Sequence, residues 1–98
     1  SLVHDPKNFD VRLFKALTCL FIFPGYYCNP ISEFNETISL INSDPTRVES
    51  RPLQEIERIS WKGKRLAYLK LDLKEKADEC VKFYEAINRT LQKKRQQT

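Results

Sequence analysis

The sequence predicts a small α+β domain, in which an antiparallel sheet is capped by a C-terminal amphipathic helix. Two segments carry this prediction: residues 66–73 alternate like a strand, and residues 74–94 repeat apolar side chains at helical spacing. The chain has 98 residues, of which 41% are hydrophobic, and this suffices for the core of one domain. We therefore expect residues 1–98 to form a single domain that is part of a larger protein.

The first half of the chain contains two candidate strands. Leu17–Phe23 is rich in residues that favour strands and ends at a Pro-Gly pair. Residues 9–17 fit a helix as well as a strand, and the sequence does not decide between them. Thr37–Ile41 is a second short candidate strand, which a turn over 42–45 follows.

The second half begins with a further extended piece. Leu53–Trp61 is predicted to be extended, although the spacing of its apolar residues Leu53, Ile56 and Ile59 also allows a helical turn. A hairpin tip is expected at Trp61-Lys62-Gly63-Lys64-Arg65. Leu66–Leu73 then places Ala67 and three leucines on one face, which is the clearest strand pattern of the chain.

A helix is predicted over Lys74–Lys94. Its apolar side chains recur every three or four residues, and acidic residues crowd its first turns while basic residues crowd its end, as the helix dipole favours. Burial of five such side chains contributes about 7–15 kcal/mol, so the helix is expected to pack on the rest of the domain or on a partner. Residues 92–98 are polar and basic, and we expect them to fray.

The order of elements from Leu53 to Leu91 resembles the end of a pleckstrin-homology-like domain. In that superfold an "apolar-x-x-I-x-x-I" strand, here Leu53–Ile59, precedes a hairpin, and a closing helix caps a β-barrel. The resemblance implies such a barrel and a role in binding proteins, which is common in the superfold. The family's first hairpin, with its spaced basic residues for phosphoinositide headgroups, has no counterpart in residues 1–25.

The net charge of +4 is unevenly distributed along the chain. Residues 1–50 carry 4 Lys/Arg against 6 Asp/Glu, a net charge of −2, whereas residues 51–98 carry 13 against 7, a net charge of +6. A basic half is compatible with an anionic partner such as lipid headgroups, nucleic acid or an acidic peptide. It is equally compatible with a charge that only keeps the domain in solution.

The basic residues concentrate around the expected hairpin, where Arg58, Lys62, Lys64 and Arg65 accompany Trp61. These five residues are candidate contacts to phosphates of a lipid or of a nucleic-acid backbone. At about 1 kcal/mol for each cation near an anionic membrane, four cations supply about 4 kcal/mol, which corresponds to only a millimolar dissociation constant. On duplex DNA, four phosphate contacts would give a salt slope of about −3.6.

A second candidate surface is the turn-rich segment from Phe23 to Phe34, which carries Tyr26 and Tyr27. Aromatic side chains are enriched at the centre of protein interfaces. The sequence leaves open whether these two rings bind another protein or cap the core of the domain itself.

The three cysteines, Cys19, Cys28 and Cys80, show no spacing typical of a zinc site or a redox motif. Because their number is odd and Cys19 and Cys80 stand among apolar residues, the sequence favours free thiols and an intracellular location, cytoplasmic or nuclear. No signal-peptide pattern is found. The longest apolar run, Leu17–Phe23, is much shorter than the roughly 20 residues that a membrane span needs.

No catalytic or cofactor site is predicted. His4 is the single histidine, and the sequence places no nucleophile beside it. Glu55 and Glu57 would share one face of a strand, where we expect a solvated surface rather than an acid–base pair. With 2 Gly and 1 His, the chain also lacks the usual residues of phosphate loops and of histidine-built metal sites.

Together these patterns predict a non-catalytic module for protein–protein interaction or scaffolding, as one subunit of a larger complex. The alternative is binding to an anionic lipid, such as a phosphoinositide, or to a nucleic-acid backbone through the basic residues around 58–65. Both interpretations leave open whether the chain also assembles with a second copy of itself.

Overall fold

The computed structural model describes residues 9–21 and 28–97, with side chains up to residue 93. These residues form four α-helices: α1 (Phe9–Phe21), α2 (Pro30–Asn42), α3 (Arg51–Lys70) and α4 (Lys74–Gln97). Neither of the two described ranges contains a β-strand, so the predicted α+β class with an antiparallel sheet is wrong, and the protein is all-α.

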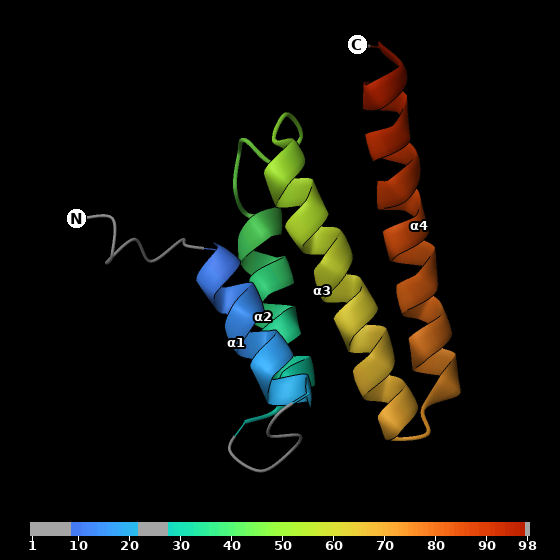
Figure 1. Ribbon diagram of the computed structural model, residues 1–98. Coiled ribbons are helices and arrows are strands. Elements are labelled where there is room, and N and C mark those ends of the chain that lie inside the picture. Colours follow the sequence, from blue (N-terminus) through green and yellow to red (C-terminus); the bar gives the residue numbers. More distant parts are fainter. Residues whose placement is uncertain (1–8, 22–27, 98) are drawn as a thin grey trace, which may run out of the picture.

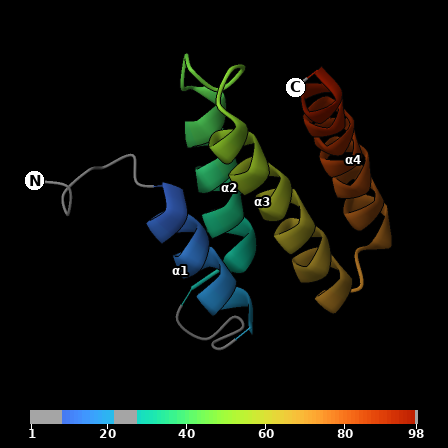
Figure 2. The same ribbon diagram turned by 45° about the horizontal axis from the view of Figure 1, so that its top comes forward.

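The four helices form a flattened, open arrangement (Figures 1 and 2). Successive helices run in opposite directions, and the molecule measures 42 × 38 × 20 Å. α1, α2 and α3 pack on one another, whereas α4 packs on α3 and on no other described helix. α1 and α4 therefore lie on opposite sides of the molecule.

Both strands predicted in the first half are parts of helices. The described part of Leu17–Phe23 completes α1, so the helical alternative for residues 9–17 is the correct one. The buried side chains of α1 are spaced three or four residues apart: Phe9, Leu13, Ala16, Cys19 and Leu20. Thr37–Ile41 lies in the last two turns of α2, where an extended segment was expected.

Both α2 and α3 begin at a capping residue that a proline follows within two positions. The Asn29 side chain accepts a hydrogen bond from the backbone N–H of Ile31 at 3.0 Å. The Ser50 hydroxyl accepts one from the backbone N–H of Leu53 at 3.3 Å. Proline suits the first turn because its missing N–H would have no partner inside the helix. At both places the capping side chain and the proline mark the start of a helix, whereas the apolar pattern alone suggests a strand.

A single helix, α3, replaces the extended piece, the hairpin tip and most of the strand that were predicted over residues 53–73, and residues 71–73 form the turn before α4. Its buried residues are Gln54, Glu57, Ser60, Gly63, Lys64 and Ala67. They follow helical spacing but are polar or small, so apolar periodicity does not reveal them. The leucines that suggested a strand, Leu69, Leu71 and Leu73, are 39%, 60% and 40% exposed.

The helix predicted over Lys74–Lys94 is confirmed, and it continues to Gln97 as α4. Since no barrel surrounds it in the described parts of the chain, the resemblance to the pleckstrin-homology-like superfold does not hold. The single-domain organisation and the fraying of residues 92–98 stay predictions.

The core of the three-helix part centres on Phe34 of α2, which is fully buried. Leu13, Ala16 and Leu20 of α1 belong to the same cluster, together with a small residue of α3, Ala67. A Cβ atom at Gly63 would come within 2.7 Å of three ring atoms of Phe34. Gly63 therefore serves a close approach between a ring and a helix backbone, not a hairpin turn.

The loop between α2 and α3 is fixed to α3 by buried polar side chains. The Gln54 amide Nε2 donates to the backbone carbonyls of Arg47 at 3.0 Å and of Val48 at 2.9 Å. Arg47 Nε lies 2.9 Å from Oε1 of Glu57, a residue that is only 4% exposed. The carboxylate of Glu57 is thus held inside the structure by the loop's own guanidinium.

We expect the substitution Arg47→Ala to lower the free energy of unfolding by about 1–2 kcal/mol. Loss of one partner of a fully buried ion pair costs about 3–5 kcal/mol, and the 36% exposure of the Arg47 side chain reduces that figure. Urea denaturation measures the change. Arg47→Ala/Glu57→Gln should recover part of the loss, because the buried charge is then removed as well. A change within about 0.5 kcal/mol for Arg47→Ala, as at an ordinary surface position, would contradict this role.

Candidate functional site

α1 carries a second apolar face opposite the one that it buries. Val11, Phe14 and Phe21 are 62%, 72% and 59% exposed. With 3.6 residues per turn, these three side chains and Thr18 fall within an arc of about 80°. The buried residues of α1 lie on the opposite side of the helix. We call the four residues 11, 14, 18 and 21 the outer face of α1.

The cations of α1 do not occupy the outer face, because they pair with α2. Arg12 Nη1 lies 2.8 Å from Oε1 of Glu36. Lys15 Nζ lies 3.6 Å from Oε1 of Glu33. Both pairs tie α1 to its neighbour, and the four residues of the outer face carry no formal charge.

Such a face is the strongest candidate for a functional surface in the described part of the chain. A helix that is apolar on both sides is normally covered on both sides. Adjacent exposed apolar side chains mark sites of protein contact, and rings such as those of Phe14 and Phe21 are enriched at the centre of interfaces. The spacing 11, 14, 18 and 21 is a second helical stripe in the sequence, but its exposure depends on how α1 packs on its neighbours.

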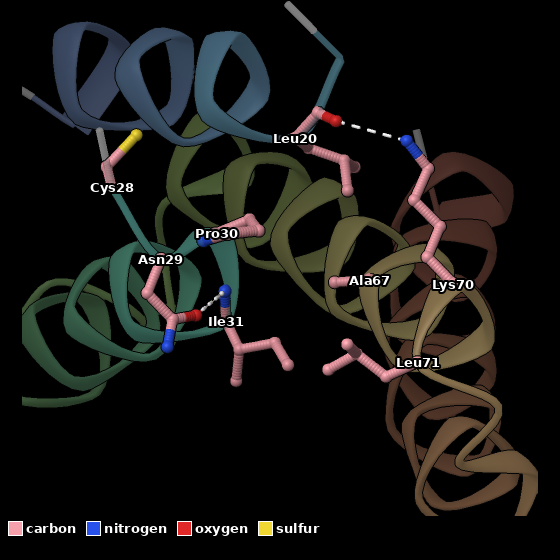
Figure 3. A pocket seen from close by; sticks show the side chains of 8 residues that line it. All are labelled: Leu20, Cys28, Asn29, Pro30, Ile31, Ala67, Lys70 and Leu71. Atoms are coloured by element: carbon pink, nitrogen blue, oxygen red, sulfur yellow. Dashed lines mark hydrogen bonds between the residues drawn. The ribbon is translucent and has the colours of Figure 1, made fainter. Parts of the chain in front are cut away.

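A pocket of about 490 Å³ lies between the last turn of α1, the start of α2 and the end of α3 (Figure 3). Eight residues line it: Leu20, Cys28, Asn29, Pro30, Ile31, Ala67, Lys70 and Leu71. Lys70 Nζ donates to the backbone carbonyl of Leu20 at 3.1 Å and lies 5.7 Å from the ring centre of Phe21. The pocket is mostly apolar, and Lys70, which lines it, carries a positive charge close to the ring of Phe21.

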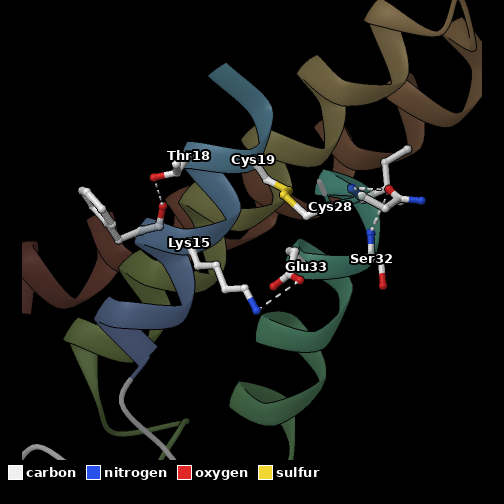
Figure 4. The surroundings of a disulfide bond; sticks show 9 residues. Lys15, Thr18, Cys19, Cys28, Ser32 and Glu33 are labelled. Carbon is white, nitrogen blue, oxygen red and sulfur yellow. Dashed lines mark hydrogen bonds and ion pairs between the residues drawn. A yellow bond between two sulfur atoms is a disulfide. The ribbon is translucent and has the colours of Figure 1, made fainter. Parts of the chain in front are cut away.

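A disulfide between Cys19 and Cys28 joins the last turn of α1 to the residue before the α2 cap (Figure 4). The prediction of free thiols is therefore wrong for this pair, whereas Cys80 is free and buried. With three cysteines the pairing cannot be deduced from spacing alone. The bond fixes the end of α1 that presents Phe21, since the two Cα atoms are held 5.9 Å apart.

The basic residues that were predicted as a binding site are distributed around α3 instead of gathering at a hairpin tip. Arg58 Nη1 donates to Oδ1 of Asn88 at 2.8 Å. Lys62 Nζ lies 5.4 Å from the ring centre of Tyr84. Arg65 Nε is buried and has no hydrogen-bond partner among the described residues. Arg58 and Lys62 thus contribute to the contact between α3 and α4.

Trp61 and Lys64 also belong to the contact between α3 and α4. The Trp61 ring stacks on Phe83, with ring centres 4.3 Å apart and planes inclined by 8°. Lys64 Nζ lies 4.5 Å from the ring centre of Trp61 and 5.7 Å from that of Tyr68. These contacts have the geometry of cation–π interactions inside the fold. The predicted site residues Tyr26 and Tyr27 lie outside the described residues.

Burial shifts the ionisation of three groups at this contact. It lowers the pKa of the Lys64 ammonium group and raises the pKa of the Cys80 thiol and of the Tyr68 hydroxyl. A buried thiol with a raised pKa stays protonated at neutral pH and reacts slowly. Within residues 9–21 and 28–97, no three His, Cys, Asp or Glu side chains are placed to hold a metal ion.

Comparison of the chain with protein-family models, with characterised proteins and with solved structures finds no match. The candidate site therefore depends on the geometry of this chain alone.

Proposed function

We propose that this domain is a non-catalytic protein-binding module, and that the outer face of α1 is its binding surface. The observation that carries the proposal is the exposure of two phenylalanines on one uncharged helix face, Phe14 at 72% and Phe21 at 59%. Each phenylalanine that a partner covers removes apolar area from water, at about 25 cal/mol per Å². The hydrophobic effect thus favours a partner with a complementary apolar surface.

The attachment of α1 to the rest of the domain supports this use. The disulfide and the two ion pairs to α2 hold the helix at several points along its length. A binding surface that is already ordered loses less conformational entropy when a partner docks. We therefore expect the backbone of α1 to change little on binding.

The alternative function, binding to an anionic lipid or nucleic acid, has less support. Arg58, Lys62 and Lys64 each contact a side chain of the α3–α4 interface. Their recruitment by phosphates would disturb contacts within the fold. Protein binding through α1 requires no such rearrangement.

The disulfide also bears on the cellular location. The intracellular expectation depended on unpaired cysteines, and the Cys19–Cys28 bond removes that basis. Structural disulfides persist in oxidising compartments and are rare in the cytosol and nucleus. We accordingly place the module in an oxidising compartment. None of the described helices is long and apolar enough to cross a membrane.

Site-specific photocrosslinking tests the proposed function. The photoreactive amino acid benzoylphenylalanine replaces Phe14 in the full chain, and a second variant carries it at Phe83, which is 52% exposed on α4. In the native source of the protein, the probe at position 14 should form covalent adducts with a protein chain, and the probe at position 83 should form fewer. Equal yields at the two positions would contradict the assignment of the outer face.

A further inference from the structure

We infer that the outer face of α1 binds a second copy of this chain, with the two α1 helices antiparallel across a twofold axis. This inference rests on the proposed function and adds the identity of the partner. In a twofold interface the same patch is used by both copies, so the patch must be complementary to itself. The spacing of the outer face meets that requirement.

The outer face is symmetric about position 16 of the chain. Val11 and Phe21 lie five residues on either side of this position, and Phe14 and Thr18 lie two residues on either side. In an antiparallel pair centred there, Val11 faces Phe21 of the second copy, and Phe14 faces Thr18 of the second copy. Each contact then sets a large ring against a smaller side chain, which lets the two helices approach closely.

The charges at the two ends of the outer face are complementary in the same arrangement. Asp10 is exposed in the first turn of α1, and Lys70 lies over Phe21 at the other end. Antiparallel pairing brings Asp10 of one copy to the end where the second copy presents Lys70. Parallel pairing would instead set the two Asp10 carboxylates against each other. Like charges in contact disfavour that arrangement.

The size of the surface predicts a weak, concentration-dependent dimer. From residue 11 to residue 21, α1 is about 15 Å long. A face of this length, with two rings that each bury at most about 150–250 Å², is smaller than the roughly 1,600 Å² of a standard interface. We therefore expect monomer and dimer to coexist, and not a permanent complex.

Sedimentation equilibrium on the full, oxidised chain from micromolar to millimolar concentration tests the inference. The wild-type chain should show reversible dimerisation, and Phe14→Ser should raise the dissociation constant at least about tenfold. Phe83→Ser is the control, because it removes a half-exposed ring from α4, on the opposite side of the molecule; this ring also stacks on Trp61, so the fold of the variant is verified separately. It should leave the dissociation constant unchanged, and circular dichroism verifies that both variants keep their helices.

Crosslinking tests the antiparallel register. Val11→Cys and Phe21→Cys chains are prepared in a Cys80→Ser background and treated with a short bis-maleimide. In the antiparallel dimer, position 11 faces position 21 of the second copy, whereas two identical positions lie about 15 Å apart along the helices. The mixture of both variants should crosslink, and each variant alone should not. Efficient crosslinking of Val11→Cys with itself would show parallel pairing and would overturn the inference.

Sedimentation and photocrosslinking together distinguish the inferred dimer from the proposed protein-binding function of the outer face. A wild-type chain that stays monomeric up to millimolar concentration, or an equal effect of Phe14→Ser and Phe83→Ser, would overturn the dimer. If the photoprobe at position 14 then forms adducts with a different protein, the proposed function stands without a second copy. If that probe also forms no more adducts than the probe at position 83, both the partner and the function are rejected.

Discussion

Gly63→Ala should lower the free energy of unfolding by about 3 kcal/mol, although alanine is the better helix former by about 1 kcal/mol. The reason is the ring of Phe34, three atoms of which would lie within 2.7 Å of the new Cβ. Phe34 is fully buried, so its ring can move away only by displacing other core side chains. Thermal unfolding followed by circular dichroism should show a fall in Tm of about 12–24 °C.

A double-mutant cycle with Phe34→Leu separates steric overlap from other causes. Leucine lacks the far end of the ring, so the loss in Gly63→Ala/Phe34→Leu should be clearly smaller than the sum of the two single losses. If the two losses of stability are additive, the destabilisation by Gly63→Ala does not come from overlap of the new Cβ with the Phe34 ring. A variant Gly63→Ala that equals or exceeds the wild type in stability would show that the ring does not lie against α3.

Loss of the disulfide should cost about 2.5 kcal/mol, as the entropy of closing so short a loop in the unfolded chain predicts. Cys19 and Cys28 are 9 positions apart, and their bond connects α1 to the start of α2. Cys28→Ser should therefore lower Tm by about 10–20 °C. It should also increase hydrogen exchange in the last turn of α1, because the end that carries Phe21 loses its covalent anchor.

A reductant provides the control for the disulfide. Reduction should lower the Tm of the wild-type chain and leave that of Cys28→Ser unchanged. Thiol titration of the unfolded, unreduced protein should find one free thiol per chain, that of Cys80. Three free thiols, or a wild-type Tm that does not respond to reductant, would refute the Cys19–Cys28 pairing.

The predictability of each helix from the sequence depended on whether its buried face is apolar. α4 buries Ala77, Cys80 and Leu91, which are helically spaced and apolar, and it was predicted almost to its ends. α3 buries Ser60 and Gly63 where hydrophobic residues are expected, and its leucines mostly face water. The alternating leucines 69, 71 and 73 span the end of α3 and the turn before α4, and this alternation resembles a strand. The cause is tertiary: Gly63 leaves room for the ring of Phe34, which the periodicity of the sequence cannot show.

The candidate site was missed for a related reason. α1 is apolar on two opposite sides, so no single face stood out, and its second half resembled a buried strand. The caps at Asn29 and Ser50, each with a proline close behind, were present in the sequence and predict helix starts by a known mechanism. They identify α2 and α3 as helices, but they do not show how α1 packs on them. The exposure of Phe14 follows only once α2 and α3 are seen to cover a single side of α1.

The most direct test of the central claim is the solvent accessibility of individual phenylalanines, measured by ¹⁹F NMR on the fluorophenylalanine-labelled chain with a soluble paramagnetic agent. The claim is that α1 has one face in the core and a second apolar face available to a protein partner. At low concentration, Phe14 and Phe21 should be strongly broadened by the agent, while Phe9 and Phe34 should be protected. Broadening of Phe14 should decrease when a partner covers the outer face. A Phe14 signal as protected as that of Phe34 in the dilute monomer would contradict the account, because the second face of α1 would then be part of the core.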